Sequence, residues 1–396
     1  MEKHGLLILV LAVWPVETWS QSVNFSPEIA LEGRTFFQEP QFPDQFNSFQ
    51  GGLILSGNAR WTSADRSLRL VFEPYLRWDS EDDERTYGDI RELSLAYRRG
   101  AWDLFLGVGQ VFWGVAESRN VVDVINQFDT LEDFDQGEKL GQPMVRIANR
   151  STLGTFELYY LPYFRAQNFP GSEGRLRFGP VVDTERAEYA RAGEAWAGEL
   201  ALRYAHRFGD LDLGLHLFDG TDRQPIIRVD PEGLRGIPFY PERKQAGVDL
   251  QYTRGPWLLK KEAVWAEVSR DSFFSTVAGL EFTFFDVARL GFDLGVIAEY
   301  LYDNRDLNRS PLTLFEDDLF AGFRVTLNDV QDTELLLGAI VDRRENAIIG
   351  SVEWQRRLGS RALLEIEGRY LSAGRDPLIS PLAEDSHLTL RLTRYF

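Results

Sequence analysis

The chain has 396 residues and no cysteine, and its 61 acidic and 43 basic side chains give a formal net charge of −18. This charge excludes nucleic-acid binding by electrostatics, which needs a basic surface, and a chain without cysteine is not held together by disulfides. Hydrophobic residues make up 44% of the chain although the mean hydropathy is only −0.27, a mixture that alternating apolar and polar residues produce.

Residues 1–20 have the layout of a secretory signal peptide. A short polar start with Lys3 precedes the apolar run Leu6–Trp14, and the short side chains of Thr18 and Ser20 stand at the −3 and −1 positions of a cleavage site. The apolar run is too short to span a bilayer. We therefore expect cleavage after Ser20.

Residues 21–396 contain segments in which apolar and polar residues alternate, as Leu211–Leu217 does most clearly. Each has roughly the length that a tilted strand needs to cross a bilayer. The chain has no linker that would divide it into domains, so we expect an all-β fold: one transmembrane antiparallel β-barrel of about 18 strands (16 to 18). The predicted strands are 27–37, 52–62, 67–79, 87–98, 102–112, 143–150, 153–164, 194–208, 211–219, 244–254, 257–269, 272–284, 289–302, 319–327, 333–343, 347–358, 361–372 and 386–396.

The connections between these strands support the count. With both termini in the periplasm, every second connection should be a short turn, and these connections are brief and rich in Gly, Asp, Asn or Pro. The long connections fall in the other, extracellular set, where the three longest are 113–142, 165–193 and 220–243. Two members of that set, near Arg270 and Arg344, are short. Trp and Tyr also cluster at strand ends, as the aromatic girdles of membrane barrels require.

The last strand alternates in the same way and ends on aromatic residues. It resembles the closing strand of bacterial outer-membrane barrels, whose terminus the barrel-assembly machinery recognises. Arg394 departs from that pattern, because an apolar or aromatic residue is usual two positions before the end. A soluble edge strand is the alternative. The predicted assembly signal is Leu388, Leu390, Leu392, Tyr395 and Phe396.

The connection 113–142 is more apolar than a surface loop requires, with Val121, Val124 and Ile125 among many acids. Folding inward would bury these three side chains against the barrel wall and would narrow the lumen. The alternative is a loop that lies outside and docks on its neighbours. The candidate constriction residues are Trp113, Glu117, Arg119, Asp123, Asn126 and Asp129.

Two segments here, Gly109–Gly114 and Val122–Asp129, resemble a largely uncharacterised group of porin-like proteins of Gram-negative bacteria. That group has a G-Q-x-x-x-W-G segment followed by a D-x-I-N-x-x-D segment after an early strand; this chain matches the second pattern and has one residue fewer between Gln110 and Trp113 than the first. The resemblance implies a barrel in the outer membrane of a Gram-negative bacterium. It implies no particular substrate.

Charged residues on the strands face the lumen by parity, and rings of such charges set ion selectivity in pores. The alternative is that they pair with one another along the wall. The candidates are Arg60, Arg69, Arg77, Arg203, Arg324, Glu353, Glu365 and Arg369. Acids in the loops and arginines on the wall argue in opposite directions about anion or cation preference.

The sequence indicates neither a metal site nor a cofactor. The acids of 129–138 do not have the spacing of a calcium loop. An outer-membrane enzyme would need a nucleophile or acid beside a histidine, and no Gly-x-Ser-x-Gly segment accompanies His206, His216 or His387.

We therefore expect a porin-like channel for the passive or selective diffusion of small solutes. A closed barrel that binds a partner, in assembly or adhesion, is the alternative, and a lipid enzyme is disfavoured. The expected partners are outer-membrane lipid, the barrel-assembly machinery and small solutes, with no nucleic acid; a homotrimer is compatible with the sequence.

Overall fold

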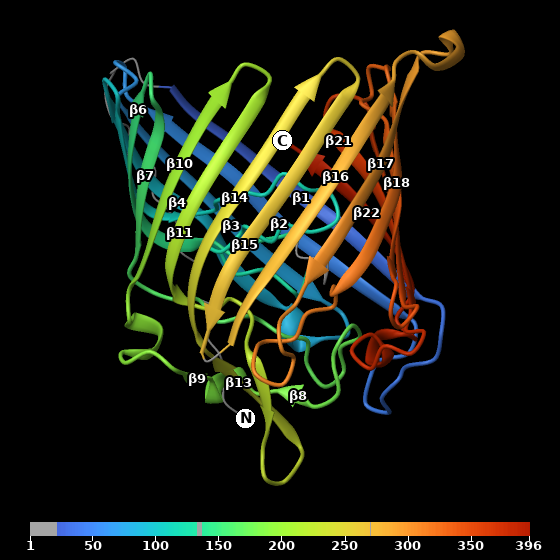
Figure 1. Cartoon of the computed structure of the whole chain (residues 1–396). Coiled ribbons are helices and arrows are strands. Elements are labelled where there is room, and N and C mark those ends of the chain that lie inside the picture. The colour runs from blue at the N-terminus through green and yellow to red at the C-terminus, as the bar shows by residue number, and fades with distance from the viewer. Residues whose placement is uncertain (1–21, 133–136, 270) are drawn as a thin grey trace, which may run out of the picture.

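The computed structural model describes residues 22–132, 137–269 and 271–396. The predicted signal peptide, residues 1–20, lies outside the described residues. The described chain forms a closed antiparallel barrel of 18 strands, because each strand pairs with the next and the first pairs with the last (Figure 1). The predicted fold class is confirmed.

The barrel strands are β1 (Ser22–Phe36), β2 (Phe49–Thr62), β3 (Leu68–Asp79), β4 (Tyr87–Arg99), β5 (Trp102–Gly109), β6 (Gln142–Ser151), β7 (Gly154–Leu161), β10 (Glu199–Phe208), β11 (Leu211–Thr221), β14 (Glu242–Arg254), β15 (Trp257–Val268), β16 (Asp271–Phe284), β17 (Phe292–Asp303), β18 (Asp317–Leu327), β19 (Glu334–Asp342), β20 (Ile348–Arg357), β21 (Ala362–Ser372) and β22 (His387–Tyr395). Each coincides with one predicted strand within a few residues.

The alternation along each strand separates an outer from an inner face. On β15, Leu259 and Trp265 are exposed on the outside, whereas Glu262, Val264 and Ala266 are buried on the inside. Successive side chains of a strand point to opposite faces, so the exposed apolar residues form an outer surface suited to lipid hydrocarbon.

The two ends of the barrel differ in the length of their connections. We call them the short-turn end, at the top of Figure 1, and the long-loop end, at the bottom. At the short-turn end the tightest turns contain Gly100, Gly209 and Gly255 at φ of 57°, 62° and 58°, a backbone region open to glycine at little cost. The long-loop end has the extended connections 37–48, 110–141, 162–198, 222–241, 304–316 and 373–386.

A small second sheet stands at the long-loop end, where the sequence predicts only loops. It consists of β8 (Val181–Val182), β9 (Glu188–Tyr189), β12 (Ile226–Val229) and β13 (Arg235–Tyr240). β12 and β13 form a hairpin, and β13 pairs in parallel with β8 and β9 from the preceding connection. Pairing between two separate loops leaves no local periodicity in the sequence, so these short strands within the predicted long loops 165–193 and 220–243 are not foreseen from the sequence. The remaining helical turns, η1 (Asp83–Arg85), η2 (Thr184–Arg186), η3 (Glu194–Trp196), η4 (Val287–Arg289) and η5 (Ser380–Leu382), are single turns.

Residues 110–132 and 137–141, which we call the inward loop, run through the inside of the barrel (Figure 1). Trp113, Val122, Val124 and Ile125 of this loop form the main hydrophobic core with inward side chains of the wall. Those wall residues are Met144, Tyr159, Leu161, Ala201, Phe218 and Val264. The core of the molecule is therefore the contact between loop and wall. No helix of the described residues is long and apolar enough to cross a membrane.

Candidate functional site

Glu262 of β15 fixes the far end of the inward loop. Its carboxylate accepts hydrogen bonds from the backbone N–H groups of Val115 at 2.6 Å, Ala116 at 2.9 Å, Val121 at 2.8 Å and Val122 at 3.3 Å. Glu262 is fully buried. A buried carboxylate is stable only when such donors surround it, and charge-assisted bonds are the stronger class. One wall side chain thus satisfies four backbone N–H groups from two stretches of the loop.

Glu299 of β17, two strands further round the barrel, binds the loop in the same way. It accepts from the N–H groups of Glu117 and Ser118, both at 2.8 Å, and from the Ser118 hydroxyl at 2.5 Å. The Glu117 carboxylate in turn lies 2.7 Å from Arg324 and 3.3 Å from Lys260. The loop therefore reaches from β5 to the wall formed by β15–β18.

Near its base the inward loop is held by contacts within itself. Asp123 accepts from the Trp113 N–H at 2.7 Å and pairs with the Lys139 ammonium at 2.5 Å. Asn126 accepts from the Val111 N–H at 2.9 Å, and its amide donates to the carbonyls of residues 109 and 140. Burial lowers the pKa of Lys139, and Asp123 opposes that shift.

The side chain of Trp113 packs between the inward loop and the wall. Its ring packs on Tyr159 at 5.7 Å and on His216 at 4.9 Å, and the Arg203 guanidinium lies 5.0 Å from the ring centroid. Arg203 also makes a bidentate pair with Asp249 at 2.8 and 2.9 Å. These residues therefore serve to seat the loop.

On the opposite side, acids of the loop meet arginines of the wall. Asp129 pairs with Arg91, and Glu132 pairs with Arg77 at 2.8 Å and with Arg391 at 3.2 Å. Burial acts to raise the pKa of Glu132, but the two arginines overcome this and lower it to about 2. The loop is consequently anchored on both sides of the lumen.

Arg119 differs from the other charged residues of the loop. It donates one hydrogen bond to the Thr313 hydroxyl at 3.1 Å, and its guanidinium lies 4.9 Å from the centre of the Phe315 ring. Burial, with the like charge of Arg305, lowers the pKa of Arg119 to about 10.

Among the described residues, the lumen has an open part between the inward loop and β18–β22. A cavity of about 410 Å³ is bordered by loop residues on one side and by wall residues on the other. Its charged lining consists of Glu117, Glu132, Glu138, Glu334, Glu353, Glu365, Glu367, Arg324, Arg369 and Arg391. Seven carboxylates against three guanidiniums give this passage an acidic lining.

This acidic passage continues toward the short-turn end. A second cavity of about 360 Å³ shares Glu334 and Gln355 with the first and adds Asp329, Asp332 and Arg357. The two cavities therefore form one path along the inner faces of β18–β21.

The predicted wall charges divide into three groups. Arg324, Glu353, Glu365 and Arg369 line the acidic passage, and Arg369 pairs with Glu353 at 2.7 Å. Arg77 and Arg203 are covered by the inward loop instead. Arg60 and Arg69 are exposed, in the halves of β2 and β3 that lie toward the short-turn end.

Of the predicted constriction residues, only Glu117 borders the acidic passage. Trp113, Asp123, Asn126 and Asp129 hold the loop in place, and Arg119 lines a separate cavity. Sequence reasoning missed Glu262 and Glu299, although their inward parity was available. Among the described residues no group of His, Asp or Glu is arranged to hold a metal ion; Asp133 and Asp135 lie outside the described residues.

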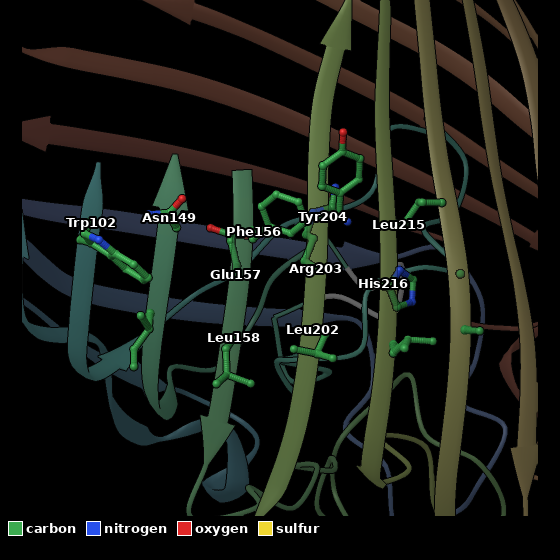
Figure 2. A pocket seen from close by; sticks show the side chains of 14 residues that line it. Trp102, Asn149, Phe156, Glu157, Leu158, Leu202, Arg203, Tyr204, Leu215 and His216 are labelled. Atoms are coloured by element: carbon green, nitrogen blue, oxygen red, sulfur yellow. The ribbon is translucent and has the colours of Figure 1, made fainter. Parts of the chain in front are cut away.

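A larger hollow, of about 670 Å³, lies on the outer face and is separate from the lumen (Figure 2). Trp102, Phe156, Leu158, Leu202 and Leu217 line it and are all exposed. The hollow is open between these side chains because Ala246 and Gly247, which also line it, are small. It is a groove in the apolar outer surface.

The terminal strand closes the barrel. Leu388, Leu390 and Leu392 are exposed on the outer face of β22, and Tyr395 stands opposite Glu28 of β1. The Phe396 N–H donates to the carbonyl of residue 27 at 3.1 Å. The aromatic end therefore lies at the short-turn end.

Comparison with known proteins gives likeness of fold only. No protein-family model matches the chain, and no curated protein matches it. Among solved structures, it is similar to OccAB1 of Acinetobacter baumannii, with a TM-score of 0.56 and 8% identity over 94% of this chain and 96% of that one. It is also similar to a BenF-like porin of Pseudomonas fluorescens Pf-5, with a TM-score of 0.52 and 11% identity over 95% and 98% of the two chains. The chain thus has the fold of an outer-membrane porin.

Proposed function

We propose that this protein is an outer-membrane channel through which small solutes diffuse, and that the inward loop narrows it. The observation that carries the proposal is the acidic passage between the inward loop and β18–β22. Around eighteen strands enclose a lumen wider than side chains alone can fill, and here one loop occupies part of it. The porin fold of the compared structures supports the same function.

We further propose that the channel favours cations. Seven glutamates border the passage, and acids also predominate in the cavity at the short-turn end. Rings of carboxylates attract cations and repel anions in pores. Arg324, Arg369 and Arg391 reduce this field locally, because each lies in an ion pair with a glutamate.

The same proposal orients the barrel. The long-loop end would face outward from the cell and the short-turn end, with Phe396, would face the periplasm, as in other barrels with an even number of strands. A cleaved signal peptide, delivery by the barrel-assembly machinery and contact with outer-membrane lipid belong to this proposal. A homotrimer would use the apolar outer face.

Solute flux tests the channel against a closed barrel. The full-length protein is reconstituted into liposomes, and swelling is followed with uncharged sugars of increasing size and with small organic cations. A channel should admit the smallest solutes and reject the larger ones, while protein-free liposomes stay unchanged. Folded barrels that pass none of these solutes would overturn the proposal.

A partner-binding barrel is the second candidate, because β8, β9, β12 and β13 give the long-loop end an ordered surface. The partner-binding candidate predicts the opposite result in the solute-flux experiment. The reconstituted barrel would be folded and would pass no solute.

A further inference from the structure

A small cavity of about 40 Å³ lies between the inward loop and the wall, toward the long-loop end. Four arginines from four separate segments line it. Arg119 belongs to the inward loop, Arg223 follows β11, Arg243 lies at the start of β14 and Arg305 follows β17. Arg223, Arg243 and Arg305 are buried.

Three of the four arginines have carboxylate partners of their own. Arg223 pairs with Glu199 at 2.7 Å, Arg243 with Asp222 at 2.8 Å and Arg305 with Asp303 at 2.7 Å. The remaining acid on the cavity, Asp123, is already paired with Lys139. These pairs leave one positive charge, that of Arg119, without a counter-charge in direct contact.

Within the described parts of the chain, Arg119 makes no ion pair. Only one of the five N–H donors of its guanidinium is used, toward Thr313. Asp303 and Asp318 are near enough for their charges to favour the Arg119 cation, yet neither makes an ion pair with it among the described residues. Arg119 is half-buried beside three like charges, and a cation partly withdrawn from water in such a place is costly unless a negative group balances it.

We propose that the cavity binds one small monovalent anion of the size class of chloride, held by Arg119 and the neighbouring guanidiniums. One negative charge balances the cluster. The cavity has room for more than a single water but not for a large anion. Gln224, whose side-chain oxygen accepts from Arg305 at 3.2 Å, keeps its amide N–H groups as further donors. The ion would join the inward loop to β14 and to the connections that follow β11 and β17.

Thermal unfolding of the full-length barrel in detergent tests this site. Melts are recorded in sodium chloride and in sodium gluconate at equal ionic strength, since gluconate is too large for the cavity. Binding to the folded state alone raises Tm with ligand concentration, and we expect a saturable rise of at least about 2 °C in chloride. Arg119→Gln should abolish the chloride-dependent rise.

Arg343→Gln is the matched control, because Arg343 lies on an exposed turn with a side chain 52% exposed and pairs with Asp317. This variant should keep the full response to chloride. Equal Tm values of the unmodified protein in the two salts would overturn the proposal.

Crystals of the unmodified protein grown in sodium bromide give an independent readout that does not depend on a variant's folding. We expect an anomalous peak between Arg119 and Arg305. Density that fits water only, with no anomalous signal there, would also overturn the site.

Discussion

Glu262 shows how one side chain can position a whole loop. Its carboxylate meets four backbone N–H groups of the inward loop at 2.6 to 3.3 Å. Parity along β15 indicates that Glu262 faces inward, but it cannot identify the groups that Glu262 meets. The partners are backbone atoms 140 to 147 positions away, and such atoms leave no trace in a residue pattern.

Glu262→Gln should loosen the inward loop. An amide has one acceptor oxygen and presents an NH₂ group to N–H donors, so several bonds are lost, at about 1.5–3 kcal/mol for each bond to a charged group. We expect a severalfold higher single-channel conductance, measured in planar bilayers. Glu267→Gln is the control, because Glu267 is exposed on the outer face of the same strand. Equal conductance of the two variants would contradict the role given to Glu262.

The ion pairs of Glu132 lead us to expect that the conductance depends on pH. The pKa of Glu132 lies at about 2, below its ordinary value of 4.5, so its ion pairs with Arg77 and Arg391 stabilise the folded loop fully above about pH 4.5. This stabilisation is lost as the pH falls from 4.5 toward 2. Conductance recorded across this range should rise on acidification, and Glu132→Gln should show the high value throughout. If the conductance of Glu132→Gln still rises on acidification as in the unmodified protein, a group other than Glu132 causes the rise.

At the scale of elements, the strands were predictable because their signal is local. The alternation in Leu211–Leu217 marks β11 without knowledge of any partner. The small sheet was not predictable, because β13 pairs with β8 and β9 across two loops. The wall charges fall between these cases: parity places Arg77 and Arg324 inside the barrel, but only the path of the loop decides that Arg77 is covered and Arg324 is open.

The inward loop as an element can be tested by shortening it. Deletion of residues 121–128 removes Val122, Val124 and Ile125 from the core with Trp113. The barrel strands pair without these residues, so we expect a folded barrel with severalfold higher conductance. Heat-modifiable migration on gels verifies folding. A folded deletion variant with unchanged conductance would mean that this segment does not narrow the passage.

The last strand carries a prediction about biogenesis. Phe396 is 63% exposed, so its side chain adds little to the packing of the folded barrel. We therefore expect Phe396 to act in recognition by the assembly machinery. Phe396→Ala should lower the amount of assembled barrel in cells severalfold, measured by heat-modifiable migration, while refolding in detergent is unaffected. Phe285→Ala, an exposed phenylalanine in another turn, should assemble normally. Equal assembly of both variants would remove Phe396 from the signal.

At the scale of the whole molecule, charge is unevenly distributed. The inward loop pairs with arginines on β3, β4 and β22, whereas the inner faces of β18–β21 carry more glutamates than arginines. The formal charge of −18 gave no hint of this asymmetry, because it depends on which part of the wall the loop covers. The passage left open is the acidic one.

The reversal potential in a potassium chloride gradient tests this account most directly. For the reconstituted full-length protein we predict a reversal potential of the sign set by potassium, the more permeant ion. Replacing Glu353, Glu365 and Glu367 together by Gln should move the potential toward zero. A reversal potential of the sign set by chloride, or one that the triple replacement leaves unchanged, would contradict an acidic, cation-favouring passage between the inward loop and β18–β22.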